Sequence, residues 1–104
     1  MGAAASFYIK RNDTYPPIIA ILSRNGSAID LTGATVRFHM GNVVDAEAEI
    51  LDDEGGQVQY SWQEGDTKTA GGYDAEFEVT DADGKVETFP QSGYIGIVVA
   101  ADLA

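Results

Sequence analysis

The sequence has no cysteine, a single histidine, a single tryptophan and only six basic residues against 17 acidic ones. Without cysteine the chain cannot form a disulfide, bind a metal through thiolates or use a cysteine nucleophile, so its stability must come from packing. The formal net charge of −11 repels phosphate backbones and anionic lipid headgroups, which disfavours a nucleic-acid partner and a membrane partner. A helical period is also missing, and no apolar stretch approaches the length that spans a bilayer.

Short segments of alternating apolar and polar residues make up most of the chain. The clearest lies at residues 72–80, where Tyr73, Ala75, Phe77 and Val79 alternate with acidic residues. Turn signals recur about every 8 to 12 residues, which is the spacing of an all-β sandwich. We therefore expect one all-β domain, an immunoglobulin-like antiparallel β-sandwich of about seven to nine strands. Residues 7–104 would form this domain, and residues 1–6 a flexible N-terminal head.

Residues 11–40 combine several of these signals. The unbroken apolar run at residues 18–22 predicts a strand buried on both faces. Asn25-Gly26 then tolerates the positive φ angles of a two-residue hairpin turn. Residues 34–40 alternate, and the alternation predicts one inward and one outward set. The inward set is Val36, Phe38 and Met40, and the outward set is Arg37 and His39.

Four residues are expected to have structural roles. Gly33 and Gly84 lie in predicted tight turns, and Trp62 has the inward parity of its strand. Tyr73 enters a late strand, where a tyrosine of an immunoglobulin-like sandwich can bond back to the preceding loop. An ordinary half-buried strand tyrosine is the alternative, and both interpretations make Tyr73 structural.

No catalytic, cofactor-binding or metal-binding residue is predicted. His39 lies on an outward strand position without an evident orienting partner or metal-ligand spacing, which indicates a surface histidine. The carboxylates fall on outer strand faces or in turns rather than across a cleft. The acidic turns at residues 52–54 and 81–84 leave a weak Ca²⁺ site open, although turn geometry alone accounts for their aspartates.

A protein interface is the functional feature that the sequence favours. Residues 7–10 predict an edge strand, and aromatic residues next to proline suit an interface anchor. The candidate interface residues are Phe7, Tyr8, Tyr15, Pro16, Phe89 and Pro90. The acidic surface would meet a basic patch on the partner.

Several motifs together resemble one family. DLTGATVRFHM at residues 30–40, VQYSWQEGDT at 58–67, GGYDAEFEVT at 71–80 and ADGKVETFP at 82–90 are similar to the N-terminal immunoglobulin-like domain of phage baseplate upper proteins and related tailed-phage virion proteins. The resemblance covers the chain from about residue 7 onward. It implies a non-enzymatic virion component, assembled in the host cytoplasm, that docks in repeated copies on other virion proteins.

Alternatives remain at this stage. Baseplate upper proteins of this kind usually continue into a linker and a C-terminal assembly domain, whereas this sequence stops at Ala104. A capsid-decoration or head–tail protein is therefore the first alternative. The second is a host-surface or carbohydrate-binding module, which would use exposed aromatic residues such as Tyr15 and Trp62. An enzyme is the least favoured class.

Overall fold

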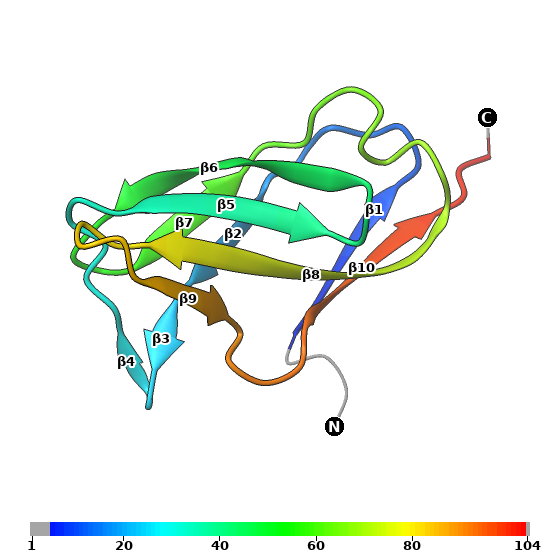
Figure 1. The fold of residues 1–104 in the computed structure, drawn as a ribbon. Helices are drawn as coiled ribbons and strands as arrows, with labels where there is room; N and C mark the ends of the chain where they lie inside the picture. The colour runs from blue at the N-terminus through cyan, green and yellow to red at the C-terminus, as the bar shows by residue number, and fades with distance from the viewer. Residues whose placement is uncertain (1–4, 104) are drawn as a thin grey trace.

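The computed structural model describes residues 5–103, which form ten β-strands and no helix (Figure 1). The first five strands are β1 (Ala5–Lys10), β2 (Ile18–Ile21), β3 (Ser23–Arg24), β4 (Ser27–Ala28) and β5 (Thr35–Met40). The others are β6 (Val44–Asp52), β7 (Gln57–Tyr60), β8 (Gly71–Thr80), β9 (Val86–Phe89) and β10 (Ile95–Ala100). The all-β prediction is confirmed. The strand number is higher than expected because β3 and β4 form a separate two-residue hairpin.

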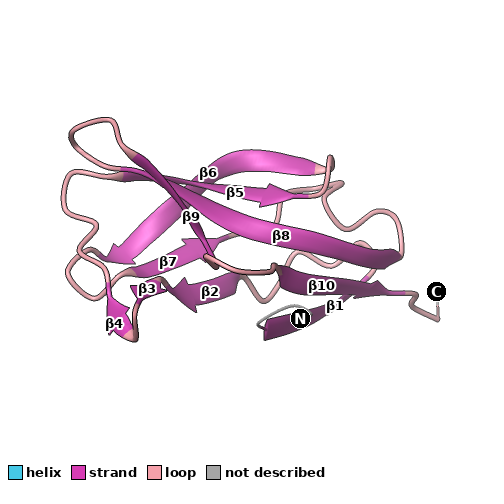
Figure 2. Ribbon diagram, turned by 60° about the horizontal axis from the view of Figure 1, so that its bottom comes forward, coloured by secondary structure: helices cyan, strands magenta, loops and turns pink. Residues whose placement is uncertain are grey.

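Eight strands form one continuous sheet in the order β1-β10-β8-β5-β6-β7-β2, with β9 also paired to β8. The β1–β10 pair is parallel and the other pairs are antiparallel. The long strand β6 pairs with β5 and then with β7, and its register shifts between Ile50 and Asp52. Such a bulge bends a strand. The sheet rolls into a nearly closed, barrel-like shape with two layers, in which β1 and β2 are the two ends (Figure 2).

The core lies between the two layers and is centred on aromatic rings. Phe38 of β5 stacks on Tyr60 with 4.7 Å between ring centroids, and Phe77 of β8 lies 5.0 Å from Phe38. Trp62 presents its ring edge-on to Phe38 at 5.7 Å and to Tyr60 at 5.5 Å. These separations suit favourable aromatic pairs. The alternation predicted that Val36, Phe38 and Met40 face inward, and all three are buried.

Strand β2 differs from the prediction. Its apolar run predicted burial on both faces, but Ile19 is 51% exposed and Ile21 is 61% exposed. Ile18 and Leu22 are buried. The two layers cover only the inner face of each strand, so the outward side chains of β2 face solvent, as do the two glutamines opposite them on β7. The prediction of a doubly buried strand is therefore wrong.

The turn predictions hold in the structure. Asn25 (φ 54°) and Gly26 (φ 82°) form the turn between β3 and β4. Gly33 and Gly84 have φ of 78° and 85°. Tyr73 donates a hydrogen bond from its hydroxyl to the carbonyl oxygen of Thr69 at 2.5 Å, so it bonds back to the preceding loop.

The N-terminal strand begins earlier than predicted. β1 starts at Ala5, two residues before the expected start of the domain, and residues 1–4 of the expected head lie outside the described residues. None of residues 5–103 belongs to a helix long and apolar enough to cross a membrane.

Candidate functional site

Three of the candidate interface residues gather at one place. Tyr8, Tyr15 and Pro16 line a shallow hollow of about 260 Å³ together with Lys10 and Asp13. We call these five residues the β1 surface. Tyr8 is 70% exposed and Tyr15 is 77% exposed. Large exposed aromatic side chains next to a hollow can act as anchors for a partner.

The strand and the loop that carry these tyrosines are both held in place. On β1, Ile9 points into the core, so its neighbour Tyr8 points outward. Tyr15 lies in the connection to β2, which is anchored by the buried side chain of Thr67. The Thr67 hydroxyl donates to the carbonyl oxygen of Asp13 at 2.8 Å, and the N–H of Asn12 donates to the carbonyl oxygen of Thr67 at 3.0 Å.

The sequence did not single out Thr67, because a threonine in a polar loop resembles any other turn residue. The only sequence feature that could have identified Thr67 was its place in the Gly65-Asp66-Thr67 part of a family motif. The loop itself is fastened by Tyr60, whose hydroxyl donates to Asp66 Oδ2 at 2.5 Å. Burial, followed by this hydrogen bond and the charge of Asp66, raises the pKa of Tyr60 well above its usual range. A tyrosine is protonated at neutral pH even at its ordinary pKa of about 10, and the raised pKa keeps the Tyr60 hydroxyl a donor at more alkaline pH as well.

The other three candidate interface residues lie elsewhere. Phe89 pairs with Phe77 across β8 and β9 and is only 3% exposed, so its predicted exposure is wrong. Phe7 is partly buried and packs on Trp62, with 5.8 Å between ring centroids. Pro90 is half-buried and lines a second hollow beside β2. Trp62 itself is buried, which removes it from any exposed carbohydrate-binding face.

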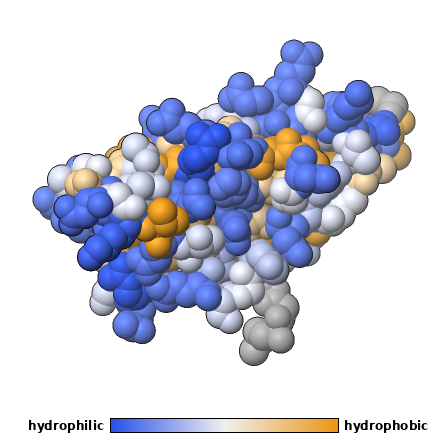
Figure 3. All heavy atoms as spheres, viewed as in Figure 1, coloured by the Kyte–Doolittle hydropathy of each residue, from blue (hydrophilic) through white to orange (hydrophobic). Residues whose placement is uncertain are grey.

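The outer face of β5, β6 and β8 is strongly acidic. The carboxylates on this face outnumber its basic side chains, which are Arg37 and His39. The carboxylates are Asp45, Glu47, Glu49, Asp74, Glu76 and Glu78. We call this the acidic face. Figure 3 shows hydrophilic residues over most of the visible surface, with small apolar patches between them.

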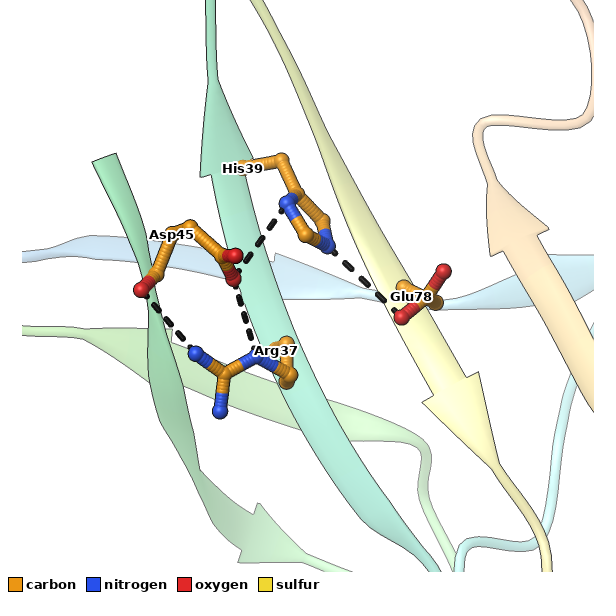
Figure 4. A network of polar contacts seen from close by, with 4 residues as sticks. All are labelled: Arg37, His39, Asp45 and Glu78. Atoms are coloured by element: carbon orange, nitrogen blue, oxygen red, sulfur yellow. Dashed lines mark hydrogen bonds and ion pairs between the residues drawn. The ribbon is translucent and has the colours of Figure 1, made fainter. Parts of the chain in front are cut away.

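His39 has neighbours that the sequence did not predict. Its Nδ1 lies 3.5 Å from Asp45 Oδ1, and its Nε2 lies 3.6 Å from Glu78 Oε1 (Figure 4). Arg37 donates from Nε to the same Asp45 oxygen at 2.9 Å and from a terminal nitrogen to the Asp45 carbonyl oxygen at 2.9 Å. Strand pairing brings these side chains together, since His39 is opposite Asp45 and Arg37 is opposite Glu78. The expectation of a histidine without partners is wrong.

The acidic turns use their carboxylates internally. Asp81 Oδ1 accepts hydrogen bonds from the N–H groups of Asp83 and Lys85, both at 2.9 Å. Asp52 Oδ1 accepts one from the N–H of Gly55 at 3.1 Å. Within residues 5–103, no group of three or more His, Cys, Asp or Glu side chains is placed to hold a metal ion. Turn geometry therefore accounts for these aspartates.

Taken together, the fold and these surfaces define a small all-β domain with a rolled sheet. The family model described as the BppU N-terminal domain, that of the baseplate upper protein, matches residues 8–90. The chain therefore belongs to this family of phage baseplate structural proteins.

Solved structures add a likeness of fold. The chain is similar to CopC from Methylosinus trichosporium OB3b, with a TM-score of 0.55 and 14% sequence identity. The alignment covers 97% of this chain and 89% of the CopC chain. At this identity the likeness concerns the fold alone. Among curated proteins, none matches the sequence significantly.

Proposed function

We propose that this chain is a non-enzymatic, immunoglobulin-like docking module of a phage baseplate or tail, which attaches in repeated copies to other virion proteins. Membership of the baseplate upper protein N-terminal family supports this proposal. The virion would be its location, with assembly in the host cytoplasm and neither nucleic acid nor membrane as a partner. The observation that carries the proposal is the exposed tyrosine pair of the β1 surface.

The proposed mechanism of docking combines three physical effects. Tyr8 and Tyr15 supply apolar ring area with few rotatable bonds and a hydroxyl that can bond at the rim of an interface. The free edge of β1 can pair with an extended strand of the partner. The acidic face steers the chain toward a basic partner and increases the association rate more than the final affinity.

The test compares binding of the chain to purified baseplates and to purified capsids of the same phage. The double variant Tyr8→Ala, Tyr15→Ala is expected to bind baseplates at least about tenfold more weakly, because anchor truncation often costs about 2 kcal/mol. Tyr94→Ala, at another exposed tyrosine, is the matched control and should bind like the wild type. Circular dichroism checks that each variant is folded.

Two results would contradict this assignment. Wild-type affinity in the double variant would remove the β1 surface from docking. Saturable binding to capsids without binding to baseplates would favour the alternative of a capsid-decoration or head–tail protein.

A carbohydrate-binding role is the second candidate, and the same tyrosine pair favours it. Exposed aromatic rings beside a hollow can stack on sugar rings. Of the two aromatic residues expected to bind sugar, Tyr15 is exposed and Trp62 is buried. Titration of the chain with host cell-wall glycans at about 1 mM tests this role by chemical-shift changes. Shift changes at the two tyrosines would support it, and their absence would exclude it.

A further inference from the structure

Strand β2 presents a free sheet edge beside an apolar hollow. It pairs only with β7, with Ile18 opposite Tyr60 and Ile21 opposite Gln57, so among the described strands its other edge has no partner. This edge borders a hollow of about 400 Å³, whose walls include Ile19, Ile21 and, from the opposite side, apolar residues of the β9–β10 region. We call it the β2 groove. The residues of the opposite wall are Phe89, Pro90 and Ile95.

The two ends of the sheet differ in how they are protected. Natural proteins usually blunt an exposed edge with charged side chains, proline or a covering element, because a bare apolar edge pairs with other chains. β1 carries Lys10 at its end. Pro16 and Pro17 precede β2, but the strand itself has neither a charged side chain nor a proline, and two of its isoleucines are more than half exposed. An edge of this kind is suited to be covered by another strand.

We propose that the β2 groove binds an extended segment of a basic partner protein, which adds to the sheet as a further strand beside β2. The backbone of the segment pairs with the free edge of residues 18–21. Its apolar side chains, at alternate positions, enter the hollow against Phe89, Pro90 and Ile95. Lysine or arginine residues flank the apolar positions.

Charge identifies a basic segment rather than a second copy of this chain as the occupant. Two copies each carry a net charge of −11 and repel one another. The four residues of β2 also span only about 13 Å, so pairing two such strands buries far less than the roughly 1,200 Å² of a stable interface. This inference goes beyond the docking proposed above, since it uses none of the β1 surface.

Two carboxylates on the outer face lie in the same rows as Ile19 and Ile21. Strand register places Ile19, Gln59 and Glu49 in one row across the outer face and Ile21, Gln57 and Asp52 in the next. Both carboxylates are therefore two strands from the β2 edge, or about 10 Å. An added strand would lie one spacing further out, about 14 Å from these carboxylates, so they attract its lysine or arginine residues through long-range charge rather than by direct ion pairs.

The experiment titrates the isotope-labelled chain with a synthetic nonapeptide, in which alternating valine and threonine are flanked by lysines. We expect saturable chemical-shift changes and slower amide exchange at residues 18–21. A peptide of the same core with flanking glutamates should bind at least about tenfold more weakly.

Matched variants locate the site. Ile21→Lys should weaken binding at least about tenfold, because it places a cation at the edge that the basic segment approaches. Val43→Lys adds the same charge at another exposed apolar position and should bind within about twofold of the wild type. Ile19→Thr keeps strand propensity and should weaken binding without adding charge. Tyr8→Ala, Tyr15→Ala should bind the peptide normally, so the two proposals can fail independently.

Each contrary outcome overturns the inference. No saturable change at about 1 mM lysine-flanked peptide would exclude the added strand. Equal binding of both peptides would exclude the basic segment, and equal weakening by Val43→Lys would exclude the β2 groove as its site. A dimer in sedimentation that Ile21→Lys dissociates would make a second copy the occupant.

Discussion

Gly56 shows how strongly a single residue can be constrained in this fold. It is buried, its φ is 66°, and a Cβ atom there would lie 2.8 Å from the carbonyl oxygen of Leu22 and 2.9 Å from that of Ile29. The Gly56 carbonyl oxygen also accepts the N–H of Leu22 at 2.8 Å. The residue therefore joins the start of β7 to the segment after β2, and only glycine fits there.

We expect Gly56→Ala to lower the free energy of unfolding by about 2 to 4 kcal/mol, the sum of a left-handed backbone penalty and a steric clash. Gly84→Ala is the matched control, since Gly84 also has a positive φ but no neighbour within 4 Å of a Cβ. It should cost about 1 to 2 kcal/mol. Urea unfolding measures both, and equal losses would show that the contacts at Gly56 contribute nothing.

At the scale of elements, two carboxylates hold connecting segments in place. Glu87 of β9 accepts hydrogen bonds from Arg24 of β3, one of them at 2.9 Å, and so fastens the β3–β4 hairpin to the sheet. Asp30 accepts from the Thr32 hydroxyl at 2.6 Å and from the Thr32 N–H at 2.9 Å. The side-chain hydrogen bond with Arg24 lowers the pKa of Glu87, and the Thr32 hydroxyl, followed by its N–H, lowers the pKa of Asp30.

These shifts predict the direction of a pH dependence. A carboxyl whose pKa is lower in the folded state stabilises the fold above its unfolded pKa, about 4, and this contribution is lost as the pH falls through the folded pKa. The free energy of unfolding should therefore decrease on acidification below about pH 4. The slope in this range should be shallower in Asp30→Asn and in Glu87→Gln than in Glu64→Gln, which removes one exposed loop carboxyl. Equal slopes in all three variants would refute the assignment.

Among the elements, the β-strands follow from local pattern to different degrees. β5, β7 and β8 show regular alternation, and the structure buries the apolar parity of each, apart from the half-buried Tyr73. β2 has an apolar residue at every position, so the pattern could not show which of its faces lacks a cover. That depends on how the sheet rolls, because the core covers only the inner face of β2.

At the scale of the whole molecule, the net charge of −11 is spread over a small domain. Mutual repulsion of these charges opposes the compact state, and salt screens it with a Debye length of about 8 Å at physiological ionic strength. Ion pairs such as Arg37–Asp45 neutralise only part of the charge of the acidic face.

We expect sodium chloride to raise the melting temperature by a few degrees between low and physiological ionic strength, because screening relieves repulsion in the folded state. The double variant Glu54→Lys, Glu64→Lys reduces the negative charge at two exposed loop positions and should show a smaller rise. Differential scanning calorimetry measures both proteins. A melting temperature that falls with salt would mean that ion pairs outweigh the repulsion.

The candidate site was only partly predictable. Tyr8, Tyr15 and Pro16 were named from aromatic residues near proline and a predicted edge strand, and the structure brings them to one hollow. Phe89 met the same local criterion but lies in the core, because its position opposite Phe77 turns it inward. Proximity to proline carries no information about which side of a strand faces the core.

The sequence by itself determined the all-β class, the inward parity of the alternating strands, the turns and, through its motifs, the family. These features depend on residues close together in the chain. Only the tertiary structure decided which strands end the sheet, which aromatic residues gather outside and which carboxylates flank His39. These outcomes depend on pairings across long separations, such as the ion pair of Arg11 with Asp102, 91 positions apart. A local pattern cannot carry them, because each side chain's exposure is set by the strand that folding places beside it.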